Sequence, residues 1–247
     1  MLTAILTDLH ANRQALEACL AHAAQRQANR YAFLGDLVGY GGDPGWVVDT
    51  VMRYVERGAL AVMGNHDFAA AIEERKQMHP EAREAIDWTR GNLNPTQLDF
   101  LRKLPMQIRD HGVLYVHASA HAPQEWVYVH TLEDAIRSIE ATDSHMVFSG
   151  HVHMPALYRI AQDGQSGGHI PAADSVHPIR PQHRYLAIPG SCGQPRDGNP
   201  AASYALYDDV SGMLQFFRVP YDVSRAARRV IEVGLPIVFA MRLVEGL

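Results

Sequence analysis

The sequence contains little cysteine: Cys19 and Cys192 are its only two thiols in 247 residues. Two cysteines cannot form a disulfide framework or a cysteine-based zinc site, which is typical of a reducing compartment. No run of basic residues is present, and 22 Lys and Arg against 27 Asp and Glu give a formal net charge of −5. This balance argues against a nucleic-acid polymer as partner. An acidic protein can still bind phosphate where metal ions supply positive charge.

Long apolar runs are also missing. The longest run near the C-terminus, Ile237 to Met241, is far too short to span a bilayer. The N-terminus lacks the charged and apolar regions of a signal peptide. We therefore expect a cytoplasmic protein without a membrane partner. The length fits one large domain or two small ones, and we expect a single domain over 1–247; the sequence does not indicate an oligomeric state.

Short apolar segments alternate with helical patterns in the first part of the chain. Strands are predicted over Leu2 to Thr7, Tyr31 to Leu34 and Ala59 to Met63. The first connection carries apolar residues at positions 16, 19, 20 and 23, the spacing of a helix face, and the second predicts a helix from Pro44 to about Arg57. This order predicts an α/β fold with parallel pairing. Ligands of such sheets bind at the carboxyl ends of the strands.

The remaining segments are predicted more coarsely. Residues 67–104 read as a helical insertion, which is either a lid over the site or a plain helical connection. Further strands are expected over 113–116, 146–149, 185–188, 203–207 and 213–219, with a short helix over 133–140. Residues 161–181 are rich in Gly, Ser and Pro and predict a long loop or a loose hairpin. Residues 223–247 form a helical tail, broken at Gly234-Leu235-Pro236.

Polar side chains follow five of the predicted strands. In chain order they are Asp8 and His10, Asp36, Asn65 and His66, His117, and His151 and His153. Each short motif alone is also typical of a turn or a helix cap. Together they indicate that these side chains meet at one edge of a parallel sheet and form a metal site. Carboxylate and imidazole ligands suit Mn, Fe or Zn.

The same motifs resemble a known family. Asp8-x-His10, Gly35-Asp36, Gly64-Asn65-His66-Asp67, His117 and Gly150-His151-x-His153 are similar, in order, to the five motifs of the calcineurin-like metallophosphoesterases. The resemblance covers residues 1 to about 210. It includes Pro189-Gly190-Ser191 and Gly193-Gln194-Pro195-Arg196, a stretch similar to one in the small bacterial branch with its phosphodiesterases and diadenosine tetraphosphate hydrolases. It implies a four-layer α-β-β-α sandwich of two mixed β-sheets flanked by helices.

The resemblance also implies two divalent metal ions, identified only as Mn, Fe or Zn, and attack on phosphorus by a hydroxide that bridges them. The ligands it implies for the first ion are Asp8, His10, Asp36 and His153. Those for the second are Asp36, Asn65, His117 and His151, so that Asp36 is shared. His66, which is not a ligand, is expected to be the general acid, and Asp67 is expected to hold its imidazole in the right tautomer.

One departure from the family concerns the grip on phosphate. Many members carry Asp-Arg-Gly shortly after the Gly-Asp motif, and that arginine contacts phosphate. Here no arginine stands between Gly35 and Gly41, which argues against a Ser/Thr protein phosphatase. Asn12, Tyr40 and Arg196 are the candidate contacts in its place.

The expected substrate is a small phosphoester, either a phosphomonoester or a phosphodiester. A dinucleoside polyphosphate such as diadenosine tetraphosphate is the alternative substrate. A non-catalytic metal-binding scaffold is a further alternative, which is disfavoured because every ligand position and His66 are filled.

Overall fold

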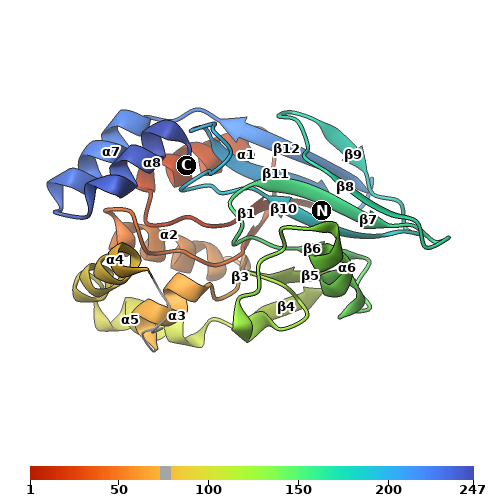
Figure 1. The fold of residues 1–247 in the computed structure, drawn as a ribbon, viewed down its shortest axis with the longest axis horizontal. Coiled ribbons are helices and arrows are strands. Elements are labelled where there is room, and N and C mark those ends of the chain that lie inside the picture. The colour runs from red at the N-terminus through yellow and green to blue at the C-terminus, as the bar shows by residue number, and fades with distance from the viewer. Residues whose placement is uncertain (73–78) are drawn as a thin grey trace.

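The computed structural model describes residues 1–72 and 79–247 (Figure 1). This described part holds two mixed β-sheets of six strands each and eight α-helices. The first sheet has the order β3-β2-β1-β11-β12-β9 and the second β4-β5-β6-β10-β7-β8. The predicted sandwich of two mixed sheets flanked by helices is therefore confirmed.

The first sheet consists of β1 (Leu2–Leu6), β2 (Arg30–Phe33), β3 (Leu60–Ala61), β9 (Val176–Pro178), β11 (Ala202–Asp208) and β12 (Met213–Val219). As predicted, β1, β2 and β3 run parallel, whereas β11, β12 and β9 are antiparallel to their neighbours. Side chains alternate across β1: Ile5 enters the core between the sheets, while Ala4 and Leu6 face the core under the helices.

The helices on the outer side of this sheet come from the first half of the chain. They are α1 (Arg13–Gln25), α2 (Pro44–Val55), α3 (Asn65–Ala71), α4 (Pro80–Gly91) and α5 (Pro95–Lys103). The Asn12 side chain caps α1 by accepting from the amide of Ala15 at 3.1 Å. Helix α3 overlaps the start of the predicted helical segment 67–104, and α4 and α5 fall within it. Residues 73–78 of that segment lie outside the described residues, and its role as a lid stays a prediction.

The second sheet consists of β4 (Gln107–Asp110), β5 (Val113–Val116), β6 (Met146–Phe148), β7 (Pro155–Ile160), β8 (Ser166–His169) and β10 (Arg184–Pro189). Strands β5, β6 and β10 are parallel. Helix α6 (Leu132–Glu140) packs Ala135 and Ile139 on the face of this sheet that is turned away from the first. The predicted strands at 113–116, 146–149 and 185–188 correspond to β5, β6 and β10.

The segment 161–181 differs from its prediction. It contributes β8, which pairs with β7 in the second sheet, and β9, which pairs with β12 in the first. These two strands do not pair with each other, so the segment is not a hairpin; it crosses from one sheet to the other. Strands β4 and β7 were also not expected, because neither segment has a clear apolar pattern in the sequence.

The C-terminal helices are α7 (Val223–Glu232) and α8 (Ile237–Glu245), separated at the predicted break Gly234-Leu235-Pro236, and they pack against each other. They lie at the opposite end of the sandwich from β8 (Figure 1). Their apolar faces meet Tyr40 and Ala85. Among the helices of residues 1–72 and 79–247, none combines the length and the apolar character needed to cross a membrane.

Candidate metal centre

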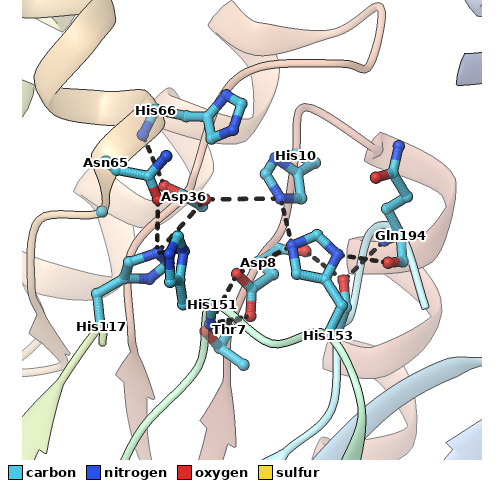
Figure 2. Close-up of polar contacts among 12 residues, drawn as sticks. Thr7, Asp8, His10, Asp36, Asn65, His66, His117, His151, His153 and Gln194 are labelled. Carbon is cyan, nitrogen blue, oxygen red and sulfur yellow. Dashed lines mark hydrogen bonds and ion pairs between the residues drawn. The ribbon is translucent and has the colours of Figure 1, made fainter. Parts of the chain in front are cut away.

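The predicted ligands come from loops that follow strands in both sheets. Asp8, Asp36 and Asn65 follow β1, β2 and β3 of the first sheet, while His117 and His151 follow β5 and β6 of the second. The expectation of a single parallel sheet edge was therefore wrong. The ends of two sheets meet, and the site lies across their junction (Figure 2).

The backbone at these positions is unusual. Asp8, His10, Asp36, His151 and His153 all have positive φ, between 46° and 68°. Few residues other than glycine adopt this region, which costs roughly 1–3 kcal/mol at each position. Because five predicted ligands have this conformation, the orientation of their side chains lowers the stability of the fold.

Two groups of side chains have donor atoms close enough to share an ion. Asp8, His10, Asp36 and His153 form one group, with all donor atoms within 4.8 Å of one another. Asp36, His117 and His151 form the second within the same limit.

Asn65 joins the second group, because its Oδ1 lies 3.1 Å from His117 Nε2. Asp36 is common to both groups, with its Oδ2 3.7 Å from His10 Nε2 and 3.4 Å from His117 Nε2. All seven predicted ligands are thus brought together.

Hydrogen bonds to backbone carbonyls fix three of the imidazoles. The Nδ1 atoms of His10, His117 and His153 lie 3.2, 2.7 and 2.6 Å from the carbonyl oxygens of residues 38, 34 and 194. A carbonyl only accepts, so each Nδ1 carries a hydrogen. In a neutral ring the lone pair is then on Nε2, which points into the centre, as metal-binding histidines require.

These inward lone pairs are the test of whether a metal fits. His10 Nε2 lies 3.1 Å from His153 Nε2, and both rings are fully buried. Burial holds the pKa of each of these imidazoles well below its usual value, so both are neutral and their lone pairs face each other. The carboxylate of Asp8 stands 3.4 Å from His153 Nε2. A cation relieves the repulsion among these donors, and the mixed nitrogen and oxygen set suits Mn, Fe or Zn.

In the second group, the charges around His117 favour its protonated form when no metal is bound. Burial by itself lowers the pKa of His117, but the carboxylates of Asp36 and Asp8 raise it more, to about 9. Burial raises the pKa of Asp8 itself to about 7. Asp36 is also buried, yet the imidazoles of His117 and His66 hold its pKa well below the usual value. A divalent ion would displace the proton of His117 and take over its charge.

Asp67 does not have the role predicted for it. Its carboxylate accepts from the amides of Leu37 and Val38 at 2.9 and 3.3 Å and from that of Gly64 at 3.0 Å. It thereby ties the start of α3 to the loop after Asp36. None of its hydrogen bonds reaches the imidazole of His66, so the expectation that Asp67 sets the tautomer of that ring was wrong.

His66 is held by packing instead. Its amide donates to Asp36 Oδ1 at 2.8 Å, and a Cβ on Gly39, whose φ is +88°, would lie 2.4 Å from its Nδ1. This buried Nδ1 has no hydrogen-bond partner among the described residues. The opposite edge of the ring, with Nε2, therefore faces the cavity that His66 lines. Only glycine leaves room for this approach.

A cavity of about 310 Å³ opens over the two groups. Asp36, Asn65, His66, His151 and His153 contribute to its wall. The aromatic residues Trp126 and Tyr128, together with Glu125, also line it and were missed in the sequence. Tyr128 stacks on the His151 ring at 3.9 Å, with 19° between the planes. The aromatic spacing after His117 is the only sequence signal for these residues, and it is equally typical of a core segment.

The candidate substrate contacts divide into two kinds. Asn12 is buried, and its side chain caps α1 and donates to the carbonyl of Gly193 and the hydroxyl of Tyr221. These contacts use its donors and acceptor, so the prediction that Asn12 contacts phosphate was wrong. Tyr40 and Arg196 both line the cavity. Tyr40 packs against His10 and His66, with ring centroids 4.6 and 4.5 Å away.

The other histidines are variously placed. His121 and His169 are exposed, and His79 is exposed at the rim of the cavity. His22 is half-buried, and its Nδ1 lies 2.7 Å from the hydroxyl of Tyr204.

Comparisons with known proteins agree with this arrangement. Residues 1–211 match the model of the calcineurin-like phosphoesterase superfamily domain. A crystal structure of a metallophosphoesterase from Sphaerobacter thermophilus superposes over 100% of both chains with a TM-score of 0.87 and 34% identity.

Two archaeal proteins are also similar over nearly their whole length. A hypothetical protein from Pyrococcus horikoshii covers 100% of this chain and 98% of its own, with a TM-score of 0.78 and 18% identity, which shows the fold alone. An uncharacterised protein from Methanocaldococcus jannaschii is 29% identical over 98% of this chain and 97% of its own. The chain belongs to the calcineurin-like phosphoesterase superfamily.

Proposed function

We propose that this protein is a phosphoesterase that uses two divalent metal ions to hydrolyse a small phosphomonoester or phosphodiester. The observation that carries the proposal is the pair of buried, neutral imidazoles whose Nε2 atoms face each other 3.1 Å apart beside the carboxylates of Asp8 and Asp36. A cation bound there would relieve the repulsion among these donors and offset the cost of the strained backbone.

The two groups would hold the ions as the family resemblance implies. Asp8, His10, Asp36 and His153 would hold one ion, and Asp36, Asn65, His117 and His151 the other. Bound Mn, Fe or Zn ions supply Lewis acidity to the phosphoryl oxygens and an activated water near neutral pH. The protein's own contribution is to hold the ligands before the ions arrive and to bury them below the cavity.

His66 would serve the leaving group. Burial lowers the pKa of its imidazole to about 4, so the ring is neutral at pH 7 in the free protein. Its Nδ1 is packed against Gly39 and its Nε2 faces the cavity, which places a donor over the substrate. The negative charge of a bound phosphoester would raise this pKa, so that the ring takes up a proton from solvent and can pass it to the leaving oxygen.

Arg196 and Tyr40 would replace the missing family arginine. Arg196 is the only arginine among the described residues that line the cavity. Its Nη2 donates to Gln194 Oε1 at 3.0 Å, and its Cζ lies 5.8 Å from the centroid of the Tyr40 ring. A guanidinium held in this way has further donors for the phosphoryl oxygens.

The test combines metal content with turnover. The purified protein is stripped with a chelator, reloaded separately with Mn²⁺, Zn²⁺, Fe²⁺ or Mg²⁺, and assayed on p-nitrophenyl phosphate, bis(p-nitrophenyl) phosphate and diadenosine tetraphosphate. We expect two ions per chain and metal-dependent release of p-nitrophenol. Faster turnover of diadenosine tetraphosphate would assign the alternative substrate. Binding of two ions without turnover of any phosphoester would leave the scaffold as the function.

A further inference from the structure

A second cavity, of about 400 Å³, lies where the two sheets end in their edge strands β8 and β9. The two strands lie beside each other at the end of the sandwich remote from α7 (Figure 1). None of its lining residues lines the cavity over the metal centre. Its volume falls within the range of small-molecule pockets, about 300–1,000 Å³.

Strand register shows which side chains enter this second cavity. Arg159 on β7 is opposite Tyr185 on β10 and Gly167 on β8, and Leu157 is opposite His169. Opposite residues share a face of the sheet. Leu157 and Tyr185 belong to the core between the sheets, so Arg159 and His169 extend that inner face to its edge.

The first sheet supplies the other wall. His177 on β9 is opposite Leu214 of the same inter-sheet core, and it lines the cavity. Its ring lies 5.1 Å from that of His169 and meets Phe216 edge-on at 5.6 Å. The Ser175 hydroxyl donates to the carbonyl of Ala172 at 2.6 Å, so its oxygen accepts from His177 Nε2 at 2.8 Å. His177 is thereby held in place without a ligand.

The charge of the lining is one-sided. Arg159, Arg180, His169 and His177 line the cavity, and no carboxylate does so among the described residues. Neither guanidinium makes an ion pair or hydrogen bond with any residue in 1–72 or 79–247. Inward-pointing charges on edge strands also discourage aggregation, but that role does not require one sign around a hollow. In a protein of net charge −5, such a set is typical of an anion site.

The cavity also has room and an apolar surface. A Cβ built on Gly167 would meet no heavy atom within 4 Å, so the missing side chain leaves open space opposite Arg159. Leu157 and Tyr185 are almost fully buried and form the inner end. A bare anion would leave this surface uncovered.

We propose that this second cavity binds a small molecule with an oxyanion group and an apolar or aromatic body. Arg159 and Arg180 hold the oxyanion, a phosphate or a carboxylate, since the planar guanidinium donates in pairs to either. The body packs on Leu157 and Tyr185. This site is distinct from the metal centre, requires no metal, and does not rest on the proposed phosphoesterase activity.

The experiment follows the imidazole of His177 in the full-length, metal-loaded protein. Histidines labelled at Cε1 are recorded by NMR, and the His177 resonance is assigned with the His177→Gln variant. The probes are phenylphosphonate, benzoate and inorganic phosphate, each against sodium chloride at equal ionic strength. We expect saturable shifts of His177 with phenylphosphonate or benzoate, at lower concentration than with inorganic phosphate. Whichever of phenylphosphonate and benzoate binds more tightly identifies the class of oxyanion.

Four variants separate a site from general charge effects. Arg159→Gln and Arg180→Gln should each raise the half-saturating concentration by about tenfold or more, whereas Arg57→Gln, an exposed arginine on another part of the surface, should not change it. Gly167→Leu fills the cavity without a change of charge and should abolish the shift. The proposal is overturned if the His177 shift rises linearly with probe concentration, if sodium chloride causes an equal shift, or if Gly167→Leu leaves the shift unchanged.

Discussion

The two cavities of this protein are built in opposite ways. Around the metal centre the titratable groups are buried, three of the imidazoles are oriented by backbone carbonyls, and five ligands hold a strained backbone conformation. In the cavity at the edge strands, Arg159 and Arg180 are exposed, regular strand backbone carries Arg159, and their guanidiniums have no partner in the described chain. The side chains of the first site are held by contacts within the protein, whereas no hydrogen bond or ion pair within the described residues holds the guanidiniums of the second.

The largest expected effect concerns the metal centre, whose side chains are held by contacts within the protein. Asp36→Asn keeps the shape of the side chain but removes the charge that both ligand groups share. We expect turnover of bis(p-nitrophenyl) phosphate to fall by about 10³-fold or more, equal to about 4 kcal/mol of transition-state stabilisation. The metal content of the variant, measured by mass spectrometry, should fall below two ions per chain.

The matched control lies in the other cavity. Arg159→Gln also removes one charge, but it should leave turnover and metal content unchanged. If both variants lose activity equally, the two cavities are not independent, and the contrast between them fails.

The next effect separates chemistry from metal binding. His66→Gln retains a polar side chain of similar reach, but it removes the group expected to donate to the leaving oxygen. We expect kcat to fall by about 10²-fold while both ions remain bound. The loss should be smaller for p-nitrophenol esters than for alkyl esters, because a better leaving group needs less help from an acid. Equal losses on both substrates would reject the acid role.

Proton release on metal binding gives the third prediction. The carboxylates of Asp36 and Asp8 raise the pKa of His117 to about 9. Because this pKa is raised on folding, the bound proton stabilises the metal-free protein fully below the unfolded value of about 6.5, and that contribution is lost as pH rises through 9.

A metal ion must displace the same proton. Its apparent affinity should therefore rise at least about tenfold per pH unit between pH 7 and 9, and calorimetry in buffers of different ionisation enthalpy should count at least one released proton at pH 8. An affinity that is flat over this range would show that His117 is neutral before the ion arrives.

The strand ends could be predicted from the sequence because their physical cause is local. Apolar runs that stop at Asp8, Asp36 and His117 specify buried strands with polar ends, and those ends became the ligand positions. What failed was the assignment of partners. Asp67 follows His66 directly, yet its carboxylate is used by the amides of Leu37 and Val38, which come from a loop that no sequence pattern places beside it.

The edge-strand cavity was missed for a related reason. Arg159, Gly167 and His177 carry no pattern along the chain, and only the crossing from β8 in one sheet to β9 in the other brings them together. Sequence patterns report which side chains are buried within one element. They do not report which loops of distant elements meet, and both the role of Asp67 and this cavity depend on such meetings.

The smallest expected effect concerns the support of Tyr40 from the C-terminal helices. Phe239 on α8 is buried and its ring lies 4.8 Å from that of Tyr40, which in turn packs on His10 and His66. Arg229 on α7 pairs with Asp43, in the loop that also carries Tyr40, with Nε 3.0 Å from Oδ1.

Phe239→Leu preserves most of the side-chain volume and should lower the free energy of unfolding by less than about 1.5 kcal/mol. It also loosens the packing on Tyr40 and should therefore lower kcat/KM roughly fivefold, about 1 kcal/mol. Phe217→Leu is the matched control, since Phe217 is equally buried but stacks on Tyr204, away from the centre. A loss of kcat/KM with Phe239→Leu and none with Phe217→Leu, at equal unfolding free energy, means that the support of the metal centre extends to the C-terminal helices; equal behaviour of the two variants confines it to the loops that carry the ligands.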